Sequence, residues 1–191
     1  IYIQCNTSHL NSLYYEAALS AEHTGKYDFQ SILTHEVGHA AGFLSLATQT
    51  GTFQVQSGNA SAAYSTMLYT RYDSLLTNQE GQSIVNKAGN GNTAFTLGET
   101  LSLGDTGLTA YNPATWQQGS SMAHIDSASD PDALMQYSIS PDTYHRTLTD
   151  GEMELMRSMG WKMVPEPGTS TLSLLGLCSC CVHECGADLQ V

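Results

Sequence analysis

Two histidines that lie four positions apart on a predicted helix constrain this chain more than any other feature. The stretch HEVGHAAG contains His35 and His39, and Asp28 precedes it as a suitable N-cap. Apolar residues recur at helical spacing, and Gly42 suits the left-handed turn that ends many helices. Positions four apart lie on one face of a helix, so both imidazoles can reach one point. We therefore predict a helix over residues 29–42 that presents both histidines to one site.

The residue types in this stretch are typical of a metal-dependent hydrolase. Neutral imidazole is a good zinc ligand, with a Zn–N bond of about 2.0–2.1 Å. Glu36 follows His35 and lies roughly 100° around the helix, too far for an ideal third ligand but close enough to reach a water on the metal. A chain of this composition gives about 0.01 chance matches to H-E-x-x-H. The motif therefore predicts a metallopeptidase site, in which the metal polarises and Glu36 moves protons.

A catalytic zinc site needs a third protein ligand, and the motif leaves that ligand open. Ser45 stands where a compact version of the motif would place a histidine. Glu152 also fits a capping box with Thr149 at the start of a C-terminal helix, which argues against its use as a ligand. The candidates for the third position are His9, His23, His124, His145, His183, Glu99, Glu152 and Glu154.

The charge balance excludes several classes of partner. Six lysines and arginines stand against 18 aspartates and glutamates, for a formal net charge of −12. Such a field repels phosphate backbones and anionic lipid headgroups, so we expect neither nucleic acid nor a peripheral membrane surface as a partner. The five cysteines are Cys5 and four within 178–185, which is not a disulfide framework for the folded region. Few lysines and many small polar residues fit an exported bacterial protein.

Weaker patterns predict the remaining elements. Residues 1–6 alternate apolar and polar side chains, as in a half-buried strand. A further helix is predicted near 64–76 and a strand near 93–103. The C-terminal helix that starts with the capping box should end at Gly160. A linker rich in proline and glycine then leads into a short apolar stretch, with the two together spanning 164–177, too short for a secure membrane span.

Taken together, these residues resemble the metzincin zinc endopeptidases. In that family H-E-x-x-H-x-x-G is followed by a third histidine and then by a turn with a methionine beneath the metal. The residues that match the first motif are His35, Glu36, His39 and Gly42. In the leishmanolysin-like branch, a long insertion separates the glycine from the third histidine. This ligand order implies that His124 is the third ligand and that Met135 is the methionine of the turn.

The resemblance implies an α+β fold of the zincin type, with an active-site helix, a long insertion, a Met-turn and a C-terminal helix. Residues 1–163 would form this catalytic domain, whose N-terminal sheet we expect to be truncated. Zinc (Zn²⁺) would be held by the three family histidines, His35, His39 and His124. Glu36 would serve as general base and then as general acid. Tyr137 would donate a hydrogen bond to the oxyanion, although an ordinary packed tyrosine is an equal alternative.

The C-terminal segment is similar to a PEP-CTERM sorting signal of exported bacterial proteins. VPEPGTSTLSLLGL at 164–177 carries the resemblance, and the sequence departs from it after 177, where a basic cluster is expected. Residues 164–191 would then be an atypical sorting tail. This implies export to the surface of a Gram-negative-type bacterium, sorting machinery as a partner, and membrane contact only through the tail. The substrate would be an extracellular protein or peptide.

Two alternatives remain open at the level of sequence. A gluzincin-like peptidase would take its third ligand from Glu99, Glu152 or Glu154. A surface or biofilm-matrix protein could bind zinc through the same histidines without cleaving anything. Loss of hydrolysis with a chelator and its return with zinc would separate an enzyme from such a binding protein.

Overall fold

The computed structural model describes residues 7–15, 24–57, 65–85 and 93–162. The chain divides into two compact units, Ile1–Trp161 and Lys162–Val191, and the described residues belong almost entirely to the first. The strand predicted at 1–6 and the tail predicted from 164 onward lie outside the described residues.

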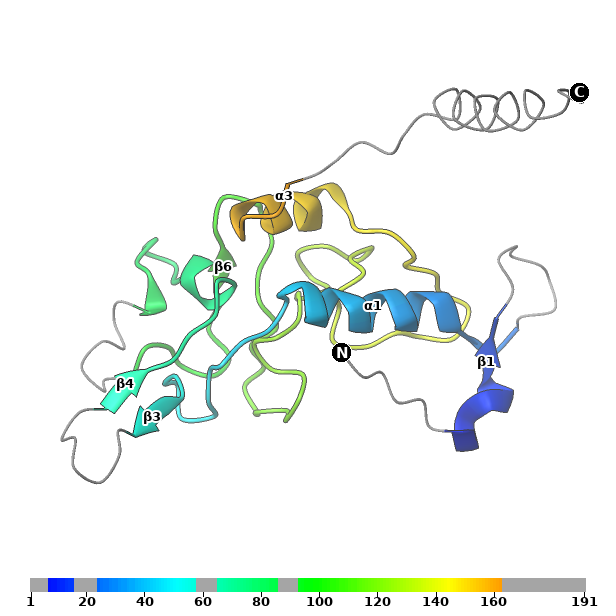
Figure 1. Cartoon of the computed structure of the whole chain (residues 1–191), viewed down its shortest axis with the longest axis horizontal. Coiled ribbons are helices and arrows are strands. Elements are labelled where there is room, and N and C mark those ends of the chain that lie inside the picture. The colour runs from blue at the N-terminus through cyan, green and yellow to red at the C-terminus, as the bar shows by residue number, and fades with distance from the viewer. Residues whose placement is uncertain (1–6, 16–23, 58–64, 86–92, 163–191) are drawn as a thin grey trace, which may run out of the picture. The chain divides into compact units, whose positions relative to one another are not determined.

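The first unit is a small mixed fold of α-helices and short strands joined by long loops (Figure 1). The elements and their bounds are η1 (Thr7–Ser12), β1 (Leu13–Tyr14), β2 (Tyr27–Asp28), α1 (Phe29–Ala41), β3 (Val55–Ser57), β4 (Ser65–Met67), η3 (Asp73–Leu75), β5 (Leu76–Thr77), β6 (Ser102–Leu103) and α3 (Asp150–Ser158). A parallel pair joins β1 to β2, and two antiparallel pairs join β3 to β4 and β5 to β6. This architecture agrees with the predicted α+β class.

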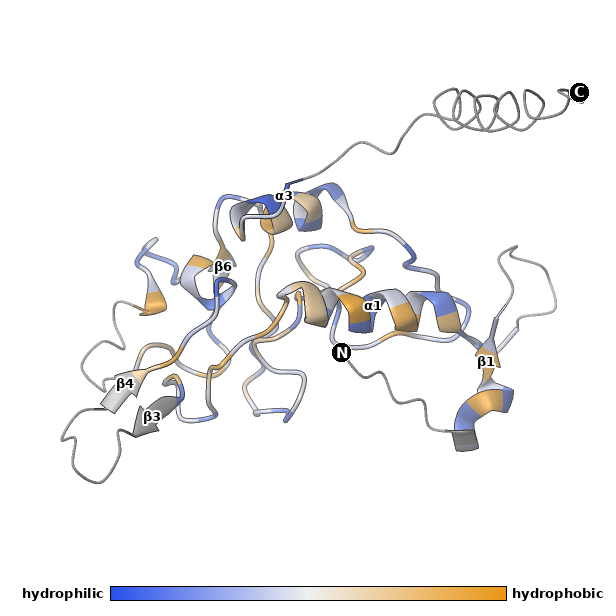
Figure 2. Cartoon of the chain, viewed as in Figure 1, coloured by the Kyte–Doolittle hydropathy of each residue, from blue (hydrophilic) through white to orange (hydrophobic). Residues whose placement is uncertain are grey.

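Helix α1 begins and ends where the sequence predicts. The Asp28 carboxylate accepts a hydrogen bond from the Ser31 backbone N–H at 2.9 Å, and Gly42 closes the helix with a φ of 122°. The helix is less buried than its apolar spacing suggests. Leu33 and Val37 are exposed (Figure 2 shows the apolar positions along α1), because the apolar core lies on the other side of the helix.

A buried ion pair fixes the start of α1 against the chain before α3. The Arg146 guanidinium donates two hydrogen bonds to the Asp28 carboxylate, at 2.7 and 2.8 Å. The side chain of Asp28 is 0% exposed and that of Arg146 is 18% exposed. Burial alone would raise the pKa of Asp28, but the hydrogen bonds from Arg146 and Ser31 outweigh it and hold the pKa below its ordinary value. The pair therefore stabilises the fold above about pH 4, and this contribution is lost as the pH falls through the folded-state pKa of Asp28.

Replacing Arg146 with methionine is expected to lower the free energy of unfolding by about 3 kcal/mol, because it leaves a buried carboxylate without its partner. Arg157→Met is the matched control, since Arg157 forms an exposed pair with Glu154. That control is expected to cost less than about 0.5–1 kcal/mol. Urea unfolding at pH 7 measures both variants. Equal losses would show that the Asp28 pair does not anchor α1.

The helix predicted near 64–76 is wrong. The structure has strand β4, a loop and the single 3-10 turn η3 over this stretch. Thr70 and Asp73 explain the difference, because each side chain accepts a hydrogen bond from the other's backbone N–H, at 2.9 and 3.0 Å. Local bonds of this kind compete with helix formation. The strand predicted near 93–103 is present only as the two residues of β6.

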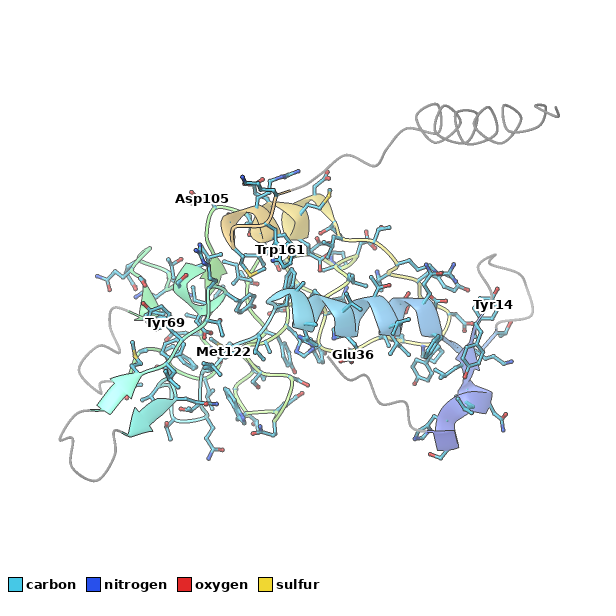
Figure 3. All side chains as sticks on the ribbon, viewed as in Figure 1. Tyr14, Glu36, Tyr69, Asp105, Met122 and Trp161 are labelled. Carbon is cyan, nitrogen blue, oxygen red and sulfur yellow. The ribbon has the colours of Figure 1, made fainter. Side chains whose placement is uncertain are left out.

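The apolar core is built mainly by the long segment between α1 and His124. The buried hydrophobic residues of the core cluster are Phe43, Phe53, Tyr72, Leu76, Ile84, Val85, Ala94, Phe95, Leu101, Leu103, Leu108, Ala110, Met122, Ile125, Ala133, Leu134, Met135, Leu155 and Met159. The capping box of α3 is confirmed, with both reciprocal bonds between Thr149 and Glu152 present. The Trp161 indole N–H donates to the Ala41 carbonyl at 2.8 Å and links the segment after α3 to the end of α1 (Figure 3).

Candidate metal centre

Three histidines converge beside α1. The Nε2 atoms of His35 and His39 each lie 3.2 Å from Nε2 of His124. One ligand atom from each ring falls within 4.8 Å of the others. The rings of His35 and His124 are nearly parallel, with an interplanar angle of 19°. The His39 ring is nearly perpendicular to both, at 88° and 86°.

The other nitrogen of each ring is held by the backbone. His35 Nδ1 lies 2.8 Å from the Leu134 carbonyl, and His124 Nδ1 lies 2.8 Å from the Ser120 carbonyl. His39 Nδ1 lies 2.6 Å from the Phe43 carbonyl. A carbonyl oxygen only accepts hydrogen bonds, so each Nδ1 carries the proton. In the neutral rings, therefore, three Nε2 lone pairs point toward one place.

Burial favours the neutral rings. It lowers the pKa of His124 to about 4, and the nearby rings of His39 and His35 act in the same direction. Burial also lowers the pKa of His35. Both rings are therefore uncharged at neutral pH, the form in which imidazole binds a metal.

The three histidines can hold a metal ion. The unprotonated Nε2 atoms of His35 and His124, which lie 3.2 Å apart, repel each other unless a cation lies between them. Tetrahedral Zn–N bonds of about 2.0–2.1 Å place their nitrogens roughly 3.3 Å apart, so the observed spacing fits an ion of this size. Hydrogen bonds from Nδ1 to carbonyls are the usual partners of metal-binding histidines.

Met135 packs directly against α1 between the two helical histidines. A Cβ at Gly38 would overlap Met135 Sδ and would lie 3.1 Å from Met135 Cε. Both residues are buried, and Met135 is 0% exposed. Only glycine permits so close an approach of the Met135 side chain to the helix, so packing constrains position 38 to glycine. Met135, the methionine expected in the turn, thus packs against the part of α1 that carries both helical histidines.

Gly38→Ala is expected to lower the free energy of unfolding by about 1–3 kcal/mol through overpacking against Met135. In a Met135→Ala background the same change is expected to raise stability by up to about 1 kcal/mol, because alanine is the better helix former. Denaturant unfolding of the four proteins measures this reversal of sign. An equal effect in both backgrounds would contradict the contact.

A cavity of about 260 Å³ adjoins the cluster at His35, and the side chains of His35 and Glu36 both line it. Figure 3 shows Glu36 projecting from α1. Tyr137 lines the same cavity, is 37% exposed, and stacks on Tyr111 with ring centroids 3.7 Å apart. The residues that line the cavity are Ser31, Ile32, His35, Glu36, Ala133, Leu134, Gln136, Tyr137, Ser138, Ile139 and His145.

The other ligand candidates within the described residues lie outside the cluster. His9 is exposed on η1, and His145 lines the cavity with its Nδ1 bonded to the Asp132 carbonyl at 2.9 Å. The Glu99 carboxylate accepts a hydrogen bond from Thr96 N–H, and the Glu154 carboxylate accepts one from Arg157. Ser45 donates to Asp73 at 2.6 Å. Glu152 bonds only backbone amides. His23 and His183 lie outside the described residues.

Sequence reasoning missed the groups that orient the cluster. These groups are the backbone carbonyls of Phe43, Ser120 and Leu134, and residue type does not indicate which carbonyls bond to a histidine. The sequence contained one usable indication of the packing of Met135 on Gly38. Gly38 lies in the interior of a predicted helix, where a glycine usually reflects close packing against another segment.

Comparisons with protein-family models, curated proteins and solved structures find no match to this chain. Within the described residues, every helix is too short or too polar to cross a membrane.

Proposed function

We propose that this chain is a zinc-dependent endopeptidase of the metzincin type with leishmanolysin-like ligand order. The observation that carries the proposal is the convergence of three Nε2 lone pairs next to a cavity lined by Glu36. Zinc, when bound, would supply a Lewis acid that polarises a peptide carbonyl and makes a water nucleophilic near neutral pH. His35, His39 and His124 would hold it.

Glu36 is the proton carrier in this proposal. Its carboxylate accepts a proton as a water oxygen attacks the carbonyl carbon, and then delivers that proton to the amine nitrogen as the C–N bond breaks. The cavity beside Glu36 receives a substrate side chain and shields the reacting bond from bulk water. The Tyr137 hydroxyl donates a hydrogen bond to the oxyanion, with its ring held by the stack on Tyr111.

The gluzincin-like alternative is weakened by the positions of its glutamates. Glu152 uses both carboxylate oxygens on backbone amides, and Glu154 pairs with Arg157.

The proposed substrates are extracellular proteins, and the proposed location is the surface of a Gram-negative-type bacterium. Both rest on the resemblance of the segment at 164–177.

The test is hydrolysis of casein by the full chain before and after metal removal. We expect cleavage of labelled casein to stop with 1,10-phenanthroline and to return when zinc is added in excess. Cleavage that persists after complete removal of metal would contradict the proposal. One zinc bound per chain without hydrolysis would favour the non-catalytic zinc-binding alternative.

A further inference from the structure

Glu152 holds two parts of the chain together with one buried carboxylate. Its Oε2 accepts hydrogen bonds from Thr149 N–H at 2.8 Å and Leu134 N–H at 3.1 Å. Its Oε1 accepts one from Met135 N–H at 2.7 Å. The residue is 0% exposed. Burial raises the pKa of Glu152, while the three amide bonds act in the opposite direction.

Capping α3 requires only part of this arrangement. A capping box uses one bond from the glutamate carboxylate to the N-cap backbone, here Thr149 N–H. The bonds to Leu134 and Met135 add nothing to the helix and instead fix a turn 17 to 18 residues earlier in the chain. The carboxylate therefore has a second role, which lies at that turn.

The turn at 134–135 contacts His35 directly and contacts a sequence neighbour of each of the other two cluster histidines. The Leu134 carbonyl accepts from His35 Nδ1 at 2.8 Å. The Met135 side chain packs against Gly38, one residue before His39. The Met135 carbonyl accepts from Ile125 N–H at 2.8 Å, directly after His124. A shift of this turn would move the carbonyl that holds His35, and it would disturb the backbone next to His39 and His124.

We propose that Glu152 is a positioning residue that sets the metal affinity of the histidine cluster by fixing the turn at 134–135. This inference rests on the metal-binding part of the proposed function. Partners one step removed from a metal typically change its affinity by about 10–100-fold when they are replaced. Glu152 lies one step further out, because it bonds the turn and not a metal ligand, so we expect an effect at the lower end of that range, about tenfold.

The experiment compares zinc affinities of full-length variants by competition with a chromophoric chelator. Glu152→Gln is close in shape but replaces one acceptor oxygen by an amide donor, which faces a backbone N–H. We expect it to weaken zinc binding about tenfold and to change the visible spectrum of the cobalt-loaded protein. Glu152→Asp keeps the charge but shortens the reach, and it gives the same readout if the glutamine variant does not fold.

Thr149→Val is the matched control. It removes the hydroxyl that accepts from Glu152 N–H and donates to Asp130 Oδ2, so it weakens the same helix cap and one bond to the preceding loop while leaving Leu134 and Met135 bonded to Glu152. We expect it to lower the thermal midpoint with zinc affinity unchanged within about twofold, since loss of a cap costs about 0.5–2 kcal/mol of stability alone. Glu152 variants that lose stability like Thr149→Val but keep the wild-type zinc affinity and cobalt spectrum would overturn the inference. A wild-type chain that binds no zinc would instead overturn the proposed function.

Discussion

Replacing Glu36 with glutamine is expected to reduce casein hydrolysis by about 10²–10⁴-fold while one zinc stays bound per chain. Glutamine keeps the size of the side chain but cannot carry a proton between the water and the leaving amine. Glu36 lines the cavity next to His35 and is exposed on α1, so the substitution disturbs no buried contact. Turnover of labelled casein and bound zinc are measured on the same preparation.

Glu80→Gln is the control for this experiment. Glu80 is also exposed, in the turn that follows η3 and β5, and its loss removes the same charge from the chain. Its turnover should equal that of the wild-type chain. A Glu36→Gln variant with near-wild-type turnover would remove Glu36 from the mechanism.

Replacing His124 with alanine is expected to weaken zinc binding by about 10²–10³-fold. Zinc sites with four protein ligands bind the ion with a free energy of about 10–16 kcal/mol, so one ligand contributes roughly 2.5–4 kcal/mol of that binding free energy. His124 is the ring that both helical histidines face, at 3.2 Å from each. Competition with a chelator of known affinity measures the change, and zinc analysis after dialysis gives the stoichiometry.

His145→Ala is the matched control, because His145 borders the same cavity but stands outside the three-histidine cluster. It should retain one zinc per chain at nearly wild-type affinity. If His124→Ala bound zinc as tightly as His145→Ala does, the metzincin proposal would fail, and the gluzincin-like alternative would replace it.

The sequence predicted the two helices well, because the capping residues that mark a helix end lie within a few residues of that end. Asp28 and Gly42 bound α1 as the sequence indicates, and the capping box of Thr149 and Glu152 starts α3. The prediction failed at 64–76, where the spacing of apolar residues is helical but the side chains of Thr70 and Asp73 bond to backbone amides instead.

The supports of the histidine cluster could not be predicted from the sequence. Each ring is oriented by a carbonyl, and every residue has one, so no residue type reveals which carbonyls lie nearby. The second role of Glu152 is hidden for a related reason. Its capping box is visible in the sequence, whereas its bonds to Leu134 and Met135 depend on the path of the intervening chain.

The separation of the metal ligands along the chain has a consequence for the stability of the whole fold. His39 and His124 are 85 residues apart, and most of the buried core lies between them. An ion held by both would act as a cross-link that restricts the unfolded chain. A covalent link across a loop of about 100 residues contributes about 4–5 kcal/mol in this way. Loss of the ion would therefore remove the proposed catalytic centre and, at the same time, the cross-link between the two ends of the core-forming segment.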